Sequence, residues 1–153
     1  MANYSGNSLK YKIATGAVVL SSDVFHAILM NTGYTFNRLT HKKYSDIVAS
    51  EMPTANGYTQ NTKVLAGISV TEVDASNKVT ITWTSPSWAV TPADLGPMAG
   101  MAIIDDTDSD KCIVGYIQFV NGAGAQSDQT QTAGGTFTVA NVEVDIVDTV
   151  TPV

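Results

Sequence analysis

The sequence predicts an all-β fold: a single-domain antiparallel β-sandwich or jelly-roll-like barrel with one long irregular loop that contains a short helix. Seven or eight short segments rich in β-branched and aromatic residues are separated by turns that contain Gly, Pro and Asn. Helix-type periodicity is almost absent. A chain of 153 residues is also long enough to bury a core as one domain.

The organising element of this prediction is a β-hairpin in the second half of the chain. Its two strands are Met101–Ile104 and Cys112–Phe119, and the polar tract Asp105–Lys111 forms the turn. Apolar residues occupy adjacent positions in both strands, so neither face can be left to water. We therefore expect this hairpin in the middle of the packed structure, with an acidic turn exposed to solvent.

The N-terminal part is expected to contain an arm followed by two strands. Residues 1–7 are small and polar and predict a flexible arm, which leaves 8–153 as the single β-sandwich domain. Ser8–Ala14 fits a short helix or a strand equally well. Ala17–Leu20 and Val24–Met30 are expected to be strands.

A long irregular connection follows, from Asn31 to Thr62, with a helix-compatible piece at Tyr44–Ser50. Connections of this length in compact domains are commonly where contacts to other molecules are made. This connection contains a basic cluster, Arg38 with His41, Lys42 and Lys43. The cluster is either a docking patch for an acidic protein surface or a solvated loop face. The candidate interface residues are Tyr34, Phe36, Arg38, His41, Lys42 and Lys43.

The rest of the chain is expected to complete the sheets. Trp88 should either fill the core or stand exposed as a ligand platform, and the core is favoured. The expected elements are a strand at Lys63–Val73, a turn at Asp74–Asn77, an amphipathic strand with Val79, Ile81 and Trp83 inward, a connection without a central strand at Thr91–Pro97, a mobile loop at Asn121–Gly135, and closing strands at Thr136–Val139 and Val142–Val147.

No catalytic or metal-binding motif is complete. The single Cys112 cannot form an intramolecular disulfide and is expected to be a small buried hydrophobe, while His26 should be a hydrogen-bonded structural residue. Asp106, Asp108 and Asp110 alternate as in calcium loops, but Lys111 stands where that motif needs Gly, and Ile117 where it needs Glu. We expect a solvated turn, no cofactor, no metal and no enzymatic activity.

Charge and hydropathy limit the classes of partner that we expect for this protein. The formal net charge is −6, and Arg38 is the only arginine, so a phosphate-binding stripe is missing and nucleic acid is not an expected partner. No apolar run approaches the length of a membrane span. The first residues lack the basic and apolar regions of a secretory signal, which predicts synthesis in the cytoplasm.

Several residue strings resemble small virion structural proteins of tailed bacteriophages, in which a Gly- and Tyr-bearing loop with a Tyr-Ser-Asp step precedes a Trp-bearing hairpin. The likeness runs from about Ala14 to Phe119, departs at Trp83-Thr84-Ser85, where acidic residues often follow the tryptophan, and is weak beyond Gly134. The strings are Asn31–Asn37, His41, Tyr44–Ile47, Glu51, Gly57–Thr59, Val79–Trp83 and Gly115–Phe119.

This resemblance implies a capsid decoration (cement) protein on the outside of the phage head. Its partner would be the major capsid protein, its oligomeric state commonly a trimer, its location the virion surface, and its site of synthesis the host cytoplasm. A tail or neck component is the alternative within the same class. A carbohydrate-binding β-sandwich is the alternative from another class, because Tyr34, Phe36, Tyr58 and Trp88 lie in or near loops and could stack on sugars.

Overall fold

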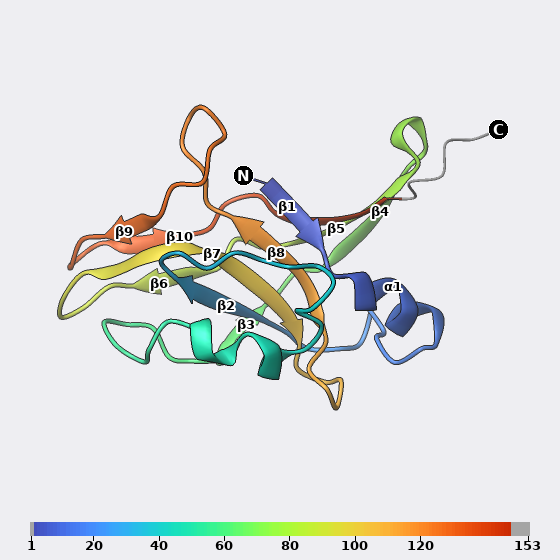
Figure 1. Ribbon diagram of the computed structural model, residues 1–153, viewed down its shortest axis with the longest axis horizontal. Coiled ribbons are helices and arrows are strands. Elements are labelled where there is room, and N and C mark those ends of the chain that lie inside the picture. Colours follow the sequence, from blue (N-terminus) through green and yellow to red (C-terminus); the bar gives the residue numbers. More distant parts are fainter. Residues whose placement is uncertain (1, 148–153) are drawn as a thin grey trace.

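The computed structural model describes residues 2–147 and shows an antiparallel all-β sandwich with one short α-helix (Figure 1), as predicted. The elements are β1 (Ala2–Ser5), α1 (Asn7–Ala14), β2 (Phe25–Asn31), the 3-10 helices η1 (Tyr44–Asp46) and η2 (Val48–Ser50), β3 (Lys63–Leu65), β4 (Ser69–Val73), the 3-10 helix η3 (Asp74–Ser76), β5 (Lys78–Trp83), β6 (Ser87–Ala89), β7 (Leu95–Asp105), β8 (Ile113–Gln118), β9 (Gln129–Gln131), β10 (Thr136–Thr138) and β11 (Val142–Val147).

The strands form one main sheet and two smaller ones. The main sheet has the order β1-β8-β7-β2-β3, and β9 pairs with the first part of β7. A three-stranded sheet has the order β11-β5-β4, and β10 pairs with β6. The predicted central hairpin is confirmed as β7–β8, with Met101 opposite Ile117, and β2 pairs along the other side of β7.

Both faces of the main sheet are buried, as the adjacent apolar residues of the central hairpin predict. On one face Phe25, Leu29 and Met101 pack with Trp83 and Val144 of the three-stranded sheet. The ring centroids of Phe25 and Trp83 are 5.6 Å apart in an edge-to-face arrangement.

The opposite face of the main sheet presents Ile28, Ile104 and Tyr116, and the long connection between β2 and β3 covers it with Tyr34 and Ile47. The main sheet is therefore a middle layer. The second sheet lies on one side of it, and an irregular segment with two 3-10 helices lies on the other.

Several other sequence predictions are confirmed. β2, β5, β10 and β11 fall on expected strands, and Ile81 and Trp83 are buried on the inward face of β5. Trp88 is 5% exposed and packs against Tyr58 and Phe137, so it belongs to the core. Cys112 is also buried, as expected.

The expectation of a flexible N-terminal arm is wrong for the described residues. Ala2–Ser5 forms β1, which pairs antiparallel with β8 from Ala2 opposite Gln118 to Ser5 opposite Gly115. The edge of β8 offers unpaired backbone groups, and a polar segment can satisfy them without an apolar side chain of its own. The ambiguous Ser8–Ala14 segment is helical, within α1. Residues 148–153 of the expected domain lie outside the described part.

Other element boundaries also differ from the predictions. Ala17–Leu20 is not a strand, and Lys63–Val73 is split into β3 and β4 around Gly67, whose φ is +63°. β7 begins at Leu95 and includes Gly96 and Pro97, because there it pairs with β9 through an irregular register. β9 itself lies inside the Asn121–Gly135 segment, which the sequence predicts as a loop without strands.

Gly115 permits a close approach of three strands at the centre of the sandwich. A Cβ at this position would lie 2.5 Å from Cγ2 of Val144 on β11 and 2.8 Å from the carbonyl oxygen of Tyr4 on β1. Both distances are shorter than van der Waals contact, and one of the opposing atoms belongs to the backbone. Only glycine therefore lets β1 and β11 pack against β8 in this way.

We expect Gly115→Ala to lower the free energy of unfolding by about 1–3 kcal/mol, because the added methyl group overpacks a filled site. The control is Gly122→Ala, where a Cβ would meet no atom within 4 Å. Urea unfolding of both variants tests this expectation. Equal stability of the two variants would contradict the tight approach at Gly115.

Candidate functional site

The long connection between β2 and β3 is fixed to the main sheet by the buried side chain of Glu51, which is 3% exposed. Its Oε1 accepts hydrogen bonds from the Tyr58 hydroxyl at 2.6 Å and from the Asn61 backbone N–H at 2.8 Å. Its Oε2 accepts one from the Tyr44 hydroxyl. A buried carboxylate with several donors holds the segments that supply them, since leaving it unpaired costs several kcal/mol.

Tyr58 extends this network to β2. Its hydroxyl oxygen accepts a hydrogen bond of 3.1 Å from the backbone N–H of Leu29. Burial, followed by the hydrogen bond to Glu51, raises the pKa of Tyr58 well above its usual range, so the hydroxyl stays protonated and donates. The connection is therefore a built layer rather than a loose loop.

The aromatic residues predicted at the interface point inward. Tyr34 is 7% exposed, stacks on His41 and packs edge-on against Tyr116. Phe36 is half-buried and stacks on Tyr116 at a centroid distance of 5.4 Å. The hydroxyl of Tyr34 lies 2.9 Å from Nδ1 of His41, to which the Asn37 backbone N–H also donates. Tyr34, Phe36 and His41 therefore anchor the connection.

Arg38 and Leu39 lie on a turn that Asn37 stabilises. The Asn37 side-chain oxygen accepts a hydrogen bond of 2.9 Å from the Leu39 N–H, which is the usual way in which Asn stabilises a turn. Leu39 is left 70% exposed. Arg38 Nε donates to the carbonyl oxygen of Ser5 at 3.1 Å, which ties this turn to the end of β1.

Lys42 and Lys43 have fixed backbones and exposed side chains. The carbonyl oxygen of Lys42 accepts hydrogen bonds from the Ile113 N–H and the Ser8 hydroxyl. Asp46 Oδ2 accepts from the N–H groups of Lys42 at 2.9 Å and Lys43 at 3.1 Å. The bond from Lys42 is the main cause that holds the pKa of Asp46 below its usual range.

Within residues 2–147, neither ammonium group of this lysine pair forms an ion pair or a hydrogen bond, whereas Lys12, Lys78 and Lys111 all pair with aspartates. We call Leu39, Lys42 and Lys43 the basic patch. It borders an open cleft of about 580 Å³, lined by Ser8, Lys12, Leu39, Thr40, Lys42, Lys43, Asp46 and Asp110. Of the six predicted interface residues, only Lys42 and Lys43 have side chains that are exposed and unengaged.

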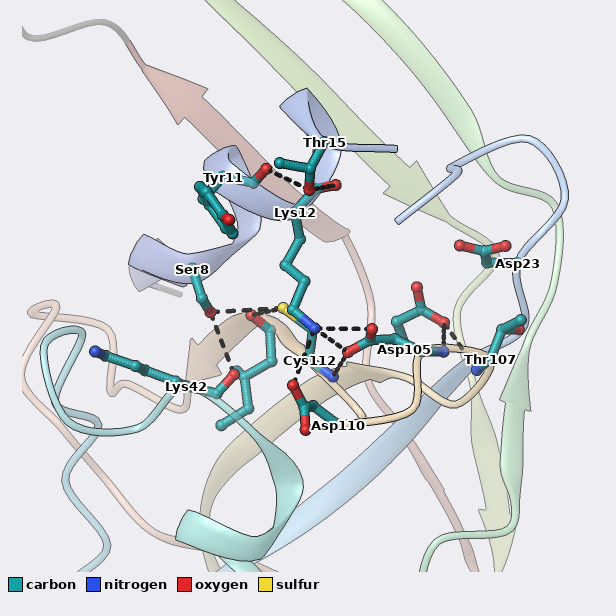
Figure 2. A network of polar contacts seen from close by, with 12 residues as sticks. Ser8, Tyr11, Lys12, Thr15, Asp23, Lys42, Asp105, Thr107, Asp110 and Cys112 are labelled. Atoms are coloured by element: carbon teal, nitrogen blue, oxygen red, sulfur yellow. Dashed lines mark hydrogen bonds and ion pairs between the residues drawn. The ribbon is translucent and has the colours of Figure 1, made fainter. Parts of the chain in front are cut away.

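The turn of the β7–β8 hairpin carries a second polar network (Figure 2). Lys12 reaches from α1 and binds both oxygens of Asp108, at 2.8 and 2.9 Å, and Asp110 at 3.2 Å. The hydrogen bond to Asp108 is the largest cause that raises the pKa of Lys12. Asp108 is 8% exposed and also accepts from the Cys112 N–H, so the expectation of a solvated turn is wrong for this residue.

The three alternating aspartates of the turn are engaged by the chain itself. Asp108 and Asp110 pair with Lys12, and Asp106 pairs with Lys111. His26 forms a hydrogen bond of 3.0 Å with Asn61, as its structural role predicts, and lies 3.6 Å from Asp106. No group of three or more metal-ligating side chains occurs between residues 2 and 147.

Asp105 is the one carboxylate of the hairpin that is fully buried, with an exposure of 0%. Its Oδ1 accepts from the N–H groups of Thr107 at 2.8 Å and Asp108 at 3.2 Å, while its Oδ2 has no hydrogen-bond partner in the described chain. Burial, together with the neighbouring Asp23 carboxyl, raises the pKa of Asp105 to about 6.

Sequence reasoning missed Glu51, Asp105 and Asp23 as buried or partly buried acidic residues. A weak signal was present for Asp105, because it directly follows four apolar residues of a strand that is buried on both faces. Glu51 follows Ile47-Val48-Ala49-Ser50 in a segment without strand or helix periodicity. Its partners Tyr44, Tyr58 and Asn61 are spread over 18 positions, so only the fold brings them together.

No protein family, curated protein or solved structure matches this chain. Among the helices described, none is long and apolar enough to cross a membrane. The geometry described above is therefore the basis for a functional proposal, together with the residue strings that resemble phage virion proteins.

We expect Tyr58→Phe to lower the free energy of unfolding by about 1–3 kcal/mol, because it removes a donor to buried Glu51 and leaves the Leu29 N–H unpaired. Tyr11→Phe is the matched control, since Tyr11 is 70% exposed and this variant should lose little stability. Chemical denaturation of both variants measures the difference. Equal losses would show that the Glu51 network does not hold the connection.

The raised pKa of Asp105 predicts a pH-dependent stability difference. The folded chain holds this proton up to about pH 6, whereas an unfolded aspartate releases it near 3.8, so its stabilising effect is present at low pH and is lost as the pH rises through 6. Asp105→Asn removes this titration and keeps an acceptor for Thr107. As the pH rises from 4 to 7, the free energy of unfolding of the variant should increase by on the order of 2–3 kcal/mol relative to that of wild type.

Urea unfolding of both proteins at pH 4, 5, 6 and 7 measures this gain, and the difference between the two chains cancels the titration of the carboxylates that do not interact with Asp105. A difference that stays constant across this range would contradict a raised pKa at Asp105.

Proposed function

We propose that this protein is a structural component of a tailed-bacteriophage virion, and that it acts as a decoration (cement) protein on the outside of the head. Two things support the proposal: the residue strings that resemble such proteins and the basic patch. The patch is the observation that carries it, because it is a fixed, unpaired cationic and apolar surface on a chain whose net charge is −6.

The fixed backbone of the patch favours binding. Hydrogen bonds to Asn37, Asp46 and β8 set the course of the chain before any partner arrives. Association then avoids the cost of ordering the loop, and what remains is the loss of translational and rotational freedom and the ordering of side chains. Exposed ammonium groups steer the protein towards acidic surfaces, and an exposed leucine beside them adds apolar contact area. An acidic surface of the major capsid protein is the proposed partner.

The mechanism is stabilisation by selective binding. A protein that binds the assembled lattice and not the free capsomers shifts the assembly equilibrium towards the lattice. The buried acidic groups of this chain fit such a passive role. Glu51 holds the connection and Asp108 holds α1, so both carboxylates are engaged in maintaining the fold.

The alternatives gain less support. A tail or neck location remains the alternative within virion proteins, and cryo-EM of the parent particle separates it from a head location. The carbohydrate-binding alternative depends on stacking platforms, but Tyr34, Tyr58 and Trp88 are all buried in the core. Phe36 is half-buried against Tyr116.

We expect the variant Lys42→Glu, Lys43→Glu to bind phage heads at least about tenfold more weakly than wild type, because the reversed charges repel an acidic surface. Heads assembled without this protein are titrated with purified chain at two salt concentrations, and their thermal stability is followed. The wild-type affinity should fall as salt rises.

The single variants Lys42→Glu and Lys43→Glu are also measured, and Lys10→Glu is their matched control, because it makes the same change of charge at a lysine that lines a different groove and donates to Val147. It should bind heads nearly as well as wild type. Equal binding by the patch variant and the control would exclude the basic patch as the contact surface, and no binding to heads by wild type would exclude the cement role.

A further inference from the structure

Strand β4 (Ser69–Val73) is an edge strand with little cover. It pairs with β5 on one side, and on its other side no strand of the described chain pairs with it. Four of its five residues are exposed, including Val70 at 50%. In Figure 1 the β4–β5 hairpin extends beyond the main sheet at one end of the molecule.

An apolar groove of about 680 Å³ lies beside this edge. Val70 stands opposite Ile81, which in turn stands opposite Val144, so these three side chains share the inward face of the three-stranded sheet. The groove therefore continues the sandwich interior outward to the edge. Its lining contains no charged residue and consists of Ile13, Gly16, Val18, Val19, Leu20, Ser21, Ile68 and Val70.

The edge has little of the usual protection against pairing, since Glu72 is its only charged residue. Proteins commonly block exposed edges with very short strands, charged side chains (lysine above all) or proline. β3, at the edge of the main sheet, has three residues, one of which is Lys63. β4 has five residues, Ser-Val-Thr-Glu-Val, with neither lysine nor proline, and its β-branched residues favour an extended backbone.

We propose that two copies of this chain pair through β4 in antiparallel orientation across a two-fold axis. Chains that each carry −6 repel one another over most of their surfaces, and the uncharged groove is a place where two copies can meet without that cost. Antiparallel pairing of identical strands uses the same surface on both partners, as a two-fold interface requires.

The positions of charge and apolar residues favour one register. Pairing centred on Glu72 would place two carboxylates directly opposite each other, which is destabilising. Pairing centred on Val70 places Val70 opposite its counterpart and Ser69 opposite Thr71, and it joins the two apolar grooves. The two three-stranded sheets then become one continuous sheet. This inference does not rest on the proposed function, and it differs from the trimer that the phage resemblance implies.

Cysteine cross-linking tests the contact and its register. Val70→Cys should give a covalent dimer with a short bismaleimide, because the two side chains lie directly opposite each other in this register. Val64→Cys is the matched control, since Val64 is 55% exposed on β3, the edge strand of the main sheet, and this variant should give no cross-linked dimer. The native Cys112 is 1% exposed and should contribute no background.

Sedimentation equilibrium provides an independent measurement. Wild type and Val64→Lys should both be dimers, whereas Val70→Lys should dissociate at least about tenfold more readily, because two ammonium groups would face each other. Circular dichroism and melting curves confirm that the variants fold. A monomeric or trimeric wild type, or equal cross-linking at positions 64 and 70, would overturn the proposal.

Discussion

The structure depends on one constraint: the β7–β8 hairpin and β2 carry apolar side chains on both faces. A sheet of this kind must be covered twice, since an exposed apolar face loses roughly 25 cal/mol for every Å² that stays in contact with water. The three-stranded sheet supplies one cover through Trp83 and Val144. The chain between β2 and β3 must supply the other, and this requirement turns a long connection into a structural layer.

A layer without regular strands has to satisfy its polar groups in other ways. The connection does so with two 3-10 helices and with Glu51, whose two oxygens accept hydrogen bonds from Tyr44 on one side and from Tyr58 and Asn61 on the other. The need to cover the main sheet also explains which residues of the predicted interface are buried and which are exposed. The aromatic rings of Tyr34 and Phe36 pack against Tyr116. The side chains of Lys42 and Lys43 stay outside, because only their backbones contact the hairpin, Lys42 at Ile113 and Lys43 at Cys112.

The sequence was sufficient for the parts of the fold that follow from local periodicity. The central hairpin, β2, β5 and β11 were predictable, because buried strands leave continuous or alternating apolar runs. β1 and β9 were not, since polar segments such as Gln129–Gln131 become strands only where a neighbouring strand offers free backbone groups. The burial of Asp108 was not predictable either, because its partner Lys12 lies 96 positions away in the sequence. The burial of Glu51 depends on residues 7 and 10 positions away, which an irregular segment brings together without any periodic pattern.

The two surfaces left without partners both border α1. Ser8 and Lys12 line the cleft beside the basic patch, while Ile13 and Gly16 line the groove beside β4. Lys12 fixes the helix to Asp108, which itself accepts from the Cys112 N–H at the start of β8. This ion pair helps to hold α1 against the central hairpin, together with the buried side chain of Leu9. The patch itself is fixed by Asp46 and β8, and β4 by its pairing with β5. A partner at the basic patch and a second copy at β4 would each bind beside a helix that the core already holds in place. Neither partner would therefore have to move α1 in order to bind.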